Sequence, residues 1–294
     1  MSSPTDAESP DAAATPSTER LLAIARELLK SWEIRGELAS IKVRNSRARP
    51  IAEYPMLHGL ASHCHRVASA ALRLIEDGLV LEAVPLIRTA YECAITAQWI
   101  AQTPDAFAAV SQRAVRTHDA YLRTVESAGL RSRLDDEQPD PHPEAVEAIR
   151  SMETSATGGA SNFEQLCMDL RPVGQQGYAL YRIMSSLSHA TVASADRYMA
   201  FDDGPGLGLT LMLEPRQPDT TSWLGILLSA MIWAGRAVDF REKEHTRRNQ
   251  LRRLAREIGT VDVLQPSEQA RLRQQQAERE RRISRRQARR SPSP

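Results

Sequence analysis

The chain has 294 residues and a formal net charge of +1, from 38 Lys+Arg against 37 Asp+Glu. That length allows one large domain or two small ones, and a hydrophobic content of 41% excludes a wholly disordered protein. The charge is unevenly spread: residues 241–294 carry 16 Lys+Arg and 7 Asp+Glu, or +9, whereas residues 1–240 carry 22 and 30, or −8. The composition therefore excludes a basic surface on residues 1–240, but it does not exclude a nucleic-acid partner.

The N-terminal residues 1–16 are polar, acidic and rich in Pro and Ser, which predicts a disordered leader. No secretory signal is predicted, because no charged segment followed by an apolar one opens the chain. The most apolar stretch, 223–234, has 12 residues and is too short to span a bilayer, so we expect a core helix and no membrane partner. Three cysteines favour reduced thiols, and hence a cytoplasmic protein, over a disulfide scaffold. Heavy use of Arg and Ala suggests a bacterial source.

Apolar residues recur at helical spacing through most of the chain after residue 17, which predicts an all-α bundle of five or six main helices. In chain order, the expected main helices cover 17 to about 43, about 51 or 55 to 76, 81–102, 104–128, 177–199 and 222–258. A short helix is expected at about 143–155, inside the loop that joins the fourth main helix to the fifth. Alternating leucines in the Gly/Pro-rich stretch 202–220 permit one short hairpin or strand.

Three regions follow from this pattern: the leader 1–16, a single helical domain 17–260 and a basic tail 261–294. Residues 266–290 favour helix by composition, yet their apolar residues form no seam at helical spacing. We therefore expect a solvated helix or disorder there, and no coiled coil. The arginine pairs of the tail indicate nonspecific attachment to RNA, DNA or an acidic partner, or a solvated segment with no dedicated partner. No aromatic residue follows Phe240, so base stacking is not predicted.

The expected helix 81–102 is almost wholly apolar except for Arg88 and Glu92, which lie four residues apart and share one face. One interpretation is a salt bridge at a water-facing edge, worth a few tenths of a kcal/mol. The other is a buried polar site, because charges in such a helix are costly unless they are paired.

The expected helix 177–199 places Tyr181, Ser185 and His189 along one ridge, with Arg182 seven residues before His189. An imidazole that moves protons and a guanidinium that stabilises an oxyanion could together catalyse phosphoryl transfer. The alternative is a core histidine hydrogen-bonded to a carbonyl group, beside a solvated arginine.

The cluster of His58, His63, Cys64 and His65 resembles a set of zinc ligands, but its spacing is wrong. On a helix His63 and His65 point about 200° apart, and His58 with His65 supplies only two ligands. The sequence also has no Walker loop and no G-x-G-x-x-G motif. We therefore expect no metal and no cofactor.

The segments GLVLEAVPLIRTAYECAITAQWI and YRIMSSLSHAT resemble two signatures of a bacterial family known as domain of unknown function 5677. The resemblance covers about residues 55–240, and Met184 stands where the family usually has Leu. It implies a compact helical domain in which a polar cluster forms, and it implies no activity. The residues of that cluster are Arg88, Glu92, Tyr181, Ser185 and His189.

A second resemblance is to HEPN-type ribonucleases, which have an Arg and a His separated by four to six residues. Arg182 and His189 match this spacing, although Ile183 replaces a residue that is commonly polar. The resemblance implies a metal-independent, homodimeric RNA-cleaving enzyme in a toxin or phage-defence setting. Whether the chain is an enzyme is left open: we favour a noncatalytic interaction protein whose Arg–Glu–His cluster joins two helices, with this ribonuclease as the alternative.

Overall fold

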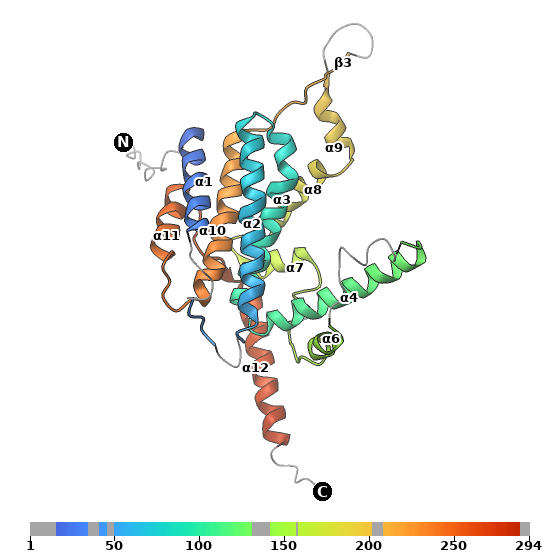
Figure 1. Ribbon diagram of the computed structural model, residues 1–294, viewed down its shortest axis with the longest axis vertical. Coiled ribbons are helices and arrows are strands. Elements are labelled where there is room, and N and C mark those ends of the chain that lie inside the picture. Colours follow the sequence, from blue (N-terminus) through green and yellow to red (C-terminus); the bar gives the residue numbers. More distant parts are fainter. Residues whose placement is uncertain are drawn as a thin grey trace, which may run out of the picture.

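The computed structural model describes residues 16–34, 41–45, 50–130, 142–156, 158–201 and 208–288. Helices make up most of these residues, and the strands are few and short, so the chain is mostly all-α (Figure 1). All of the predicted leader except Pro16, together with the last six residues of the tail, lies outside the described residues.

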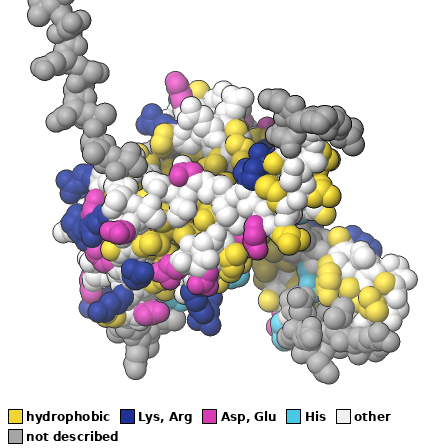
Figure 2. All heavy atoms as spheres, turned by 90° about the horizontal axis from the view of Figure 1, so that it is seen from above, with side chains coloured by type: hydrophobic (Ala, Val, Ile, Leu, Met, Phe, Trp, Pro, Cys, Tyr) yellow, Lys and Arg dark blue, Asp and Glu magenta, His cyan; other side chains and the backbone are white. Residues whose placement is uncertain are grey.

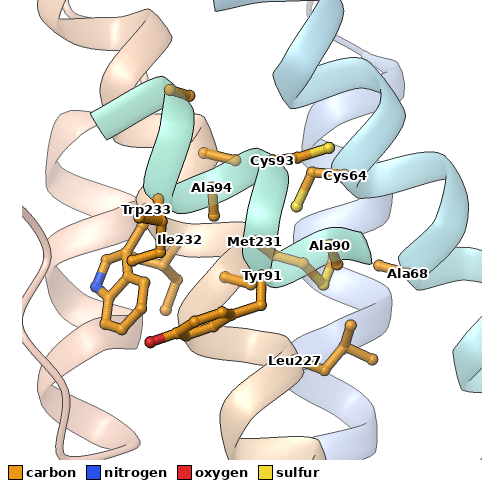
Figure 3. Close-up of a cluster of buried hydrophobic side chains, with 14 of the residues drawn as sticks. Cys64, Ala68, Ala90, Tyr91, Cys93, Ala94, Leu227, Met231, Ile232 and Trp233 are labelled. Carbon is orange, nitrogen blue, oxygen red and sulfur yellow. The ribbon is translucent and has the colours of Figure 1, made fainter. Parts of the chain in front are cut away.

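Three long helices pack together and form the core: α2 (Glu53–Glu76), α3 (Val80–Gln102) and α10 (Thr220–Arg241). Helix α1 (Thr18–Glu33) packs against α10 on one side of this group (Figure 1). Buried residues occur on every face of α3 and α10, as expected for helices surrounded by protein, whereas α1 and α2 bury one face. In the close-up of Figure 3, side chains from all three helices meet, among them Cys64 of α2, Tyr91 of α3 and Met231 of α10.

Helix α10 contains the apolar stretch for which a core helix was predicted. By length and composition it could cross a membrane, but 78% of its most apolar window is buried inside the protein. On the face seen in Figure 2, basic and acidic side chains are interspersed among hydrophobic ones.

The remaining elements are given in chain order. Between α3 and α10 the structure has α4 (Ala106–Ser127), α6 (Pro143–Arg150), α7 (Phe163–Met168), β1 (Leu170–Arg171), α8 (Gly174–Ser188), α9 (Val192–Ala195), a 3-10 helix (Asp196–Tyr198), β2 (Met199–Phe201) and β3 (Leu209–Leu211). After α10 come α11 (Arg248–Glu257), β4 (Gln265–Pro266) and α12 (Glu268–Ala288). The antiparallel hairpin of β2 and β3 pairs Met199 with Leu211, so its first strand precedes the stretch in which a hairpin was expected.

The expected helix 177–199 is wrong at its C-terminal end, because α8 stops at Ser188 and His189 is extended, with φ −107° and ψ 162°. Side-chain hydroxyls compete for the last carbonyl groups of the helix. Ser188 Oγ donates to the Met184 carbonyl at 2.7 Å, and Thr191 Oγ1 donates to the Ser186 carbonyl at 2.6 Å. Thr191 then caps the short α9. His189 therefore lies just beyond the helix rather than on its ridge.

The expected helix 222–258 is also wrong, because it divides into α10 and α11. His245 has a positive φ of 50°, and its Nδ1 lies 2.7 Å from the Asp239 carbonyl, which also accepts from the Glu242 amide at 3.2 Å. The extended segment at 41–45 pairs with the residues after α10, through a bridge between Val43 and Glu242. The first helix, expected to reach about 43, ends at Glu33, and Val43 pairs with Glu242 instead of continuing the helix.

Residues 261–267, the first residues of the predicted tail, pack against the helical body. Leu264 is fully buried and its amide donates to Gln98 Oε1 at 3.2 Å, and Trp233 Nε1 donates to the Val261 carbonyl at 2.8 Å. Strand β4 then pairs antiparallel with β1, and α12 extends away from the helical core (Figure 1).

Candidate functional site

The guanidinium of Arg88 in α3 contacts three side chains. Its Nε donates to Glu92 Oε1 at 3.0 Å, its Nη2 donates to the Tyr181 hydroxyl at 3.2 Å, and its Nη1 lies 2.9 Å from His189 Nε2. The guanidinium carbon also lies 5.1 Å from the centre of the Tyr181 ring. One side chain of α3 thus binds both the last two turns of α8 and the residue that follows it.

The position of Arg88 on α3 explains its partial burial. Its neighbours Ile87 and Ala90 are fully buried and face the core, while Arg88 lies at the edge where α8 covers α3. The side chains of Arg88 and Glu92 are 20% and 36% exposed. The pair is therefore neither a free surface salt bridge nor a fully buried one, and its main cost, desolvation, is moderate.

The contact between Arg88 and His189 determines which nitrogen of the His189 imidazole carries the proton. A guanidinium only donates hydrogen bonds, so Nε2 of His189 must accept, which places the ring proton on Nδ1. Protonation of Nε2 would instead point a donor and a second positive charge at Arg88. Among the described residues none accepts a bond from Nδ1, and the residue is exposed, so this N–H faces solvent.

Tyr181 joins the polar cluster to an aromatic group that the sequence did not predict. Phe163 of α7 packs on the Tyr181 ring at 4.5 Å between centroids, and Tyr178 lies 6.0 Å from it. Helix α7 was not expected, although a signal exists: Asn162 and Gln165 have capping-box spacing, and Asn162 Oδ1 accepts from the Gln165 amide at 2.8 Å.

The other two candidate residues behave differently. Ser185 lies on the same side of α8 as Tyr181, and its Oγ is buried without a hydrogen-bond partner among the described residues. Arg182 is exposed and makes no hydrogen bond or ion pair with any residue in the described part of the chain. The structure thus brings Glu92, Tyr181 and His189 into contact with Arg88, whereas Arg182 forms no hydrogen bond or ion pair with any of these four residues.

Neighbouring nucleophiles are held in their protonated forms. Burial, together with the smaller effect of the Glu92 charge, raises the pKa of the Cys93 thiol to about 11. Burial also raises the pKa of the Tyr91 hydroxyl, which donates to the Gly177 carbonyl at 3.2 Å. A thiol acts as a nucleophile through its thiolate, so Cys93 is not a nucleophile near neutral pH.

Of the three histidines considered as zinc ligands, His58 and His65 stack on aromatic rings, whereas His63 is exposed. His65 is buried, its Nδ1 lies 2.8 Å from the Ala61 carbonyl, and its ring stacks on Trp32 at 4.3 Å between centroids. Within the described ranges no group of three or more His, Cys, Asp or Glu side chains could hold a metal ion.

A family model described as "Family of unknown function (DUF5677)" matches residues 54–206. The matched region runs from α2 to the hairpin and contains both segments that form the polar cluster. The resemblance to HEPN-type ribonucleases gains no support from this match. No curated protein and no solved structure matches the chain significantly.

Proposed function

Because the chain belongs to the DUF5677 family, whose description carries no activity, we propose a function from the site itself: a noncatalytic nucleic-acid-binding protein. In this proposal the Arg88 cluster fastens α8 to α3, and the arginine-rich C-terminal region holds the phosphodiester backbone of a nucleic acid. The helical body acts as a rigid support for that region.

The observation that carries the noncatalytic role is the bond between Arg88 and His189. A general base needs a free nitrogen that can accept a proton, and the only unprotonated nitrogen of His189 already accepts from Arg88 at 2.9 Å. All three nitrogens of the Arg88 guanidinium also have partners within the cluster. Such mutual satisfaction is typical of a polar cluster that fixes the relative position of two helices.

The nucleic-acid role is supported by the distribution of charge. The chain beyond residue 240 carries +9, and the sequence of α12 has arginines along its whole length. Arginine binds phosphate groups through a planar fork of donors, and a run of arginines can neutralise several phosphates without reading bases.

A second candidate function is a ribonuclease of HEPN type, and one observation favours it: both Arg182 and His189 are exposed, as substrate access would require. In that mechanism His189 would be the general acid/base and Arg182 the phosphate stabiliser, with the 2′-hydroxyl of the RNA attacking its own phosphodiester. The reaction would need His189 to leave Arg88 when substrate binds.

The two functions separate in one experiment on the full-length protein. A labelled single-stranded RNA is incubated with the wild type, with His189→Ala, and with R285Q/R286Q/R289Q/R290Q, which removes four tail charges. We expect RNA to be bound and left intact by the wild type and by His189→Ala, and to be bound weakly by the four-arginine variant. RNA cleavage that disappears in His189→Ala would replace the noncatalytic proposal by the ribonuclease. Absence of RNA binding at low salt would refute the nucleic-acid role.

A further inference from the structure

Helix α12 docks on the body through a face that has no large apolar side chain. Ala270, Gln274, Ala277 and Arg281 follow one helical stripe and are the least exposed residues between 270 and 283. Of these only Ala270 is buried, at 3% exposure. The hydrophobic contribution to docking is therefore small, because so little apolar area leaves water.

Two ion pairs join α12 to the body. Arg273 pairs with Asp169, and Arg281 pairs with Asp105 and also donates to Ser155 Oγ at 3.1 Å. Asp169 is buried and has fixed partners in the body, since it accepts from Trp99 Nε1 at 3.1 Å and from Gln165 Nε2 at 2.8 Å. The body thus presents two carboxylates to α12, and their arginine partners lie about two helical turns apart.

The helix and the body are not closely packed between these ion pairs. A cavity of about 840 Å³ lies between them, lined by α12, by the junction of α3 and α4 and by the segment around Gly158. Well-packed interiors contain few voids larger than a water molecule. Docking is therefore electrostatic and loose, and separation of α12 would sacrifice few dispersion contacts.

The outer face of α12 is already available to a polyanion. Arg271, Arg279 and Arg282 are exposed, and Arg279 has no ion-pair or hydrogen-bond partner among the described residues. An anion that binds these arginines first would then lie within one helical turn of Arg281 and could compete with its carboxylate partner, because carboxylates and phosphates bind a guanidinium through the same donors.

We propose that α12 is the segment that binds the phosphodiester backbone of single-stranded nucleic acid, and that this binding displaces the helix from Asp105 and Asp169. The proposal rests on the nucleic-acid role given above and adds the binding segment and the competing contact. It implies that Asp105 and Asp169, which never touch the nucleic acid, limit the affinity of the protein for it. The contact reads only the backbone, so RNA and DNA strands of equal length should bind alike.

The test measures the affinity of the full-length protein for fluorescent oligo(U) and oligo(dT), together with hydrogen exchange of the α12 amides. Ser155→Ala removes a docking bond without changing charge, and should raise affinity about two- to fivefold. Asp105→Asn should raise it more; Asn tolerates the left-handed backbone at this residue, where φ is 57°. Asp119→Asn is the matched control, because Asp119 lies in α4, the helix that Asp105 precedes, but pairs with Arg150.

Two arginine variants provide a second, independent comparison. Arg279→Gln and Arg281→Gln each remove one charge from α12, but only Arg281 holds the helix to the body. Competition predicts that Arg281→Gln loses less affinity than Arg279→Gln, because releasing the helix offsets the lost phosphate contact. Added oligonucleotide should also accelerate amide exchange in α12 beside the displaced contacts.

Each outcome decides one part of the proposal. Binding with unchanged exchange in α12, and with equal affinities for Asp105→Asn and Asp119→Asn, would overturn the competition but leave the nucleic-acid role intact. No binding of either oligonucleotide at low salt would overturn both. Equal affinity for poly-glutamate would overturn the assignment of a phosphodiester ligand in favour of an acidic protein.

Discussion

Arg88 and His189 lie 101 residues apart in the chain, yet Nη1 of the first and Nε2 of the second are 2.9 Å apart. The two residues come from the two segments that resemble family signatures, and both lie in the matched region. Their contact ties the end of α8 to the middle of α3, so the extended backbone at His189 is held where the helix stops. The contribution of this contact to the stability of the fold can therefore be measured by mutagenesis.

The contribution of this pair can be measured by a double-mutant cycle. Arg88→Ala removes three interactions, and we expect it to lower the free energy of unfolding by about 1–2 kcal/mol, since the cluster is only partly buried. His189→Ala should cost less, and the two changes should couple by about 0.5–1 kcal/mol, as measured by urea denaturation.

Arg182→Ala is the matched control for this cycle, because it removes an exposed arginine from the same helix without breaking a contact. Its effect should stay within about 0.5 kcal/mol. Strictly additive effects of the Arg88 and His189 substitutions would show that the observed contact contributes nothing to stability.

The unpartnered hydroxyl of Ser185 gives the second prediction. Its Oγ is buried and bonds to no described residue, so Ser185→Ala removes an unsatisfied polar atom and improves helix propensity. We expect the melting temperature to stay unchanged or to rise by a few degrees. In contrast, Ser188→Ala breaks the hydrogen bond to the Met184 carbonyl that helps to end α8, and it should lower the melting temperature. A clear loss of stability in Ser185→Ala would mean that its hydroxyl has a partner, such as a bound water.

Gly177 is the third test, because the first turn of α8 approaches Tyr91 closely there. A Cβ at Gly177 would lie 2.1 Å from Val173 Cγ1 and 2.6 Å from the Tyr91 hydroxyl. Gly177→Ala should therefore cost about 1–3 kcal/mol, the usual penalty for overpacking. Gly59 in α2 is the control: nothing lies within 4 Å of its added Cβ, so Gly59→Ala should stabilise by about 0.5–1 kcal/mol. Equal effects of the two alanines on chemical denaturation would contradict the observed packing of α8 on α3.

The sequence predicted the long helices of the core well because their signals are local. The bounds expected for α2 and α3 differ from the observed ones by at most a few residues, since Gly78 and the Thr103–Pro104 pair mark their ends in the sequence. The interruptions after Ser188 and Arg241 were missed because they depend on contacts between distant segments and on serine and threonine side chains. Neither break contains a Gly or Pro that would mark it in the sequence.

Spacing along a helix could place Arg88 beside Glu92 but could not choose the neighbours of His189. The ridge argument assumed that α8 continued through His189, whereas the residue reaches Arg88 from an extended backbone. The packing of Phe163 on Tyr181 depends on a short helix whose only sequence signal is a capping box. The docking of α12 was not foreseen either, because helix periodicity is read from large apolar residues and the docking face of α12 has none.

The three buried thiols give the last prediction, a loss of stability at alkaline pH. All three cysteines are free and buried, and burial raises the pKa of Cys93 to about 11, that of Cys167 to about 12 and that of Cys64 well above its ordinary value. In the unfolded chain a thiol ionises near pH 8.5. The contribution of these thiols to stability is therefore complete below about pH 8.5 and is lost as the pH rises toward the folded pKa values, by up to about 1.4 kcal/mol per thiol per pH unit.

Between pH 7.5 and 9.5 we expect the free energy of unfolding in urea to fall by roughly 3–4 kcal/mol. Cys93→Ala should reduce that fall by about a third, and an equally steep fall in this variant would assign the alkaline transition to other groups.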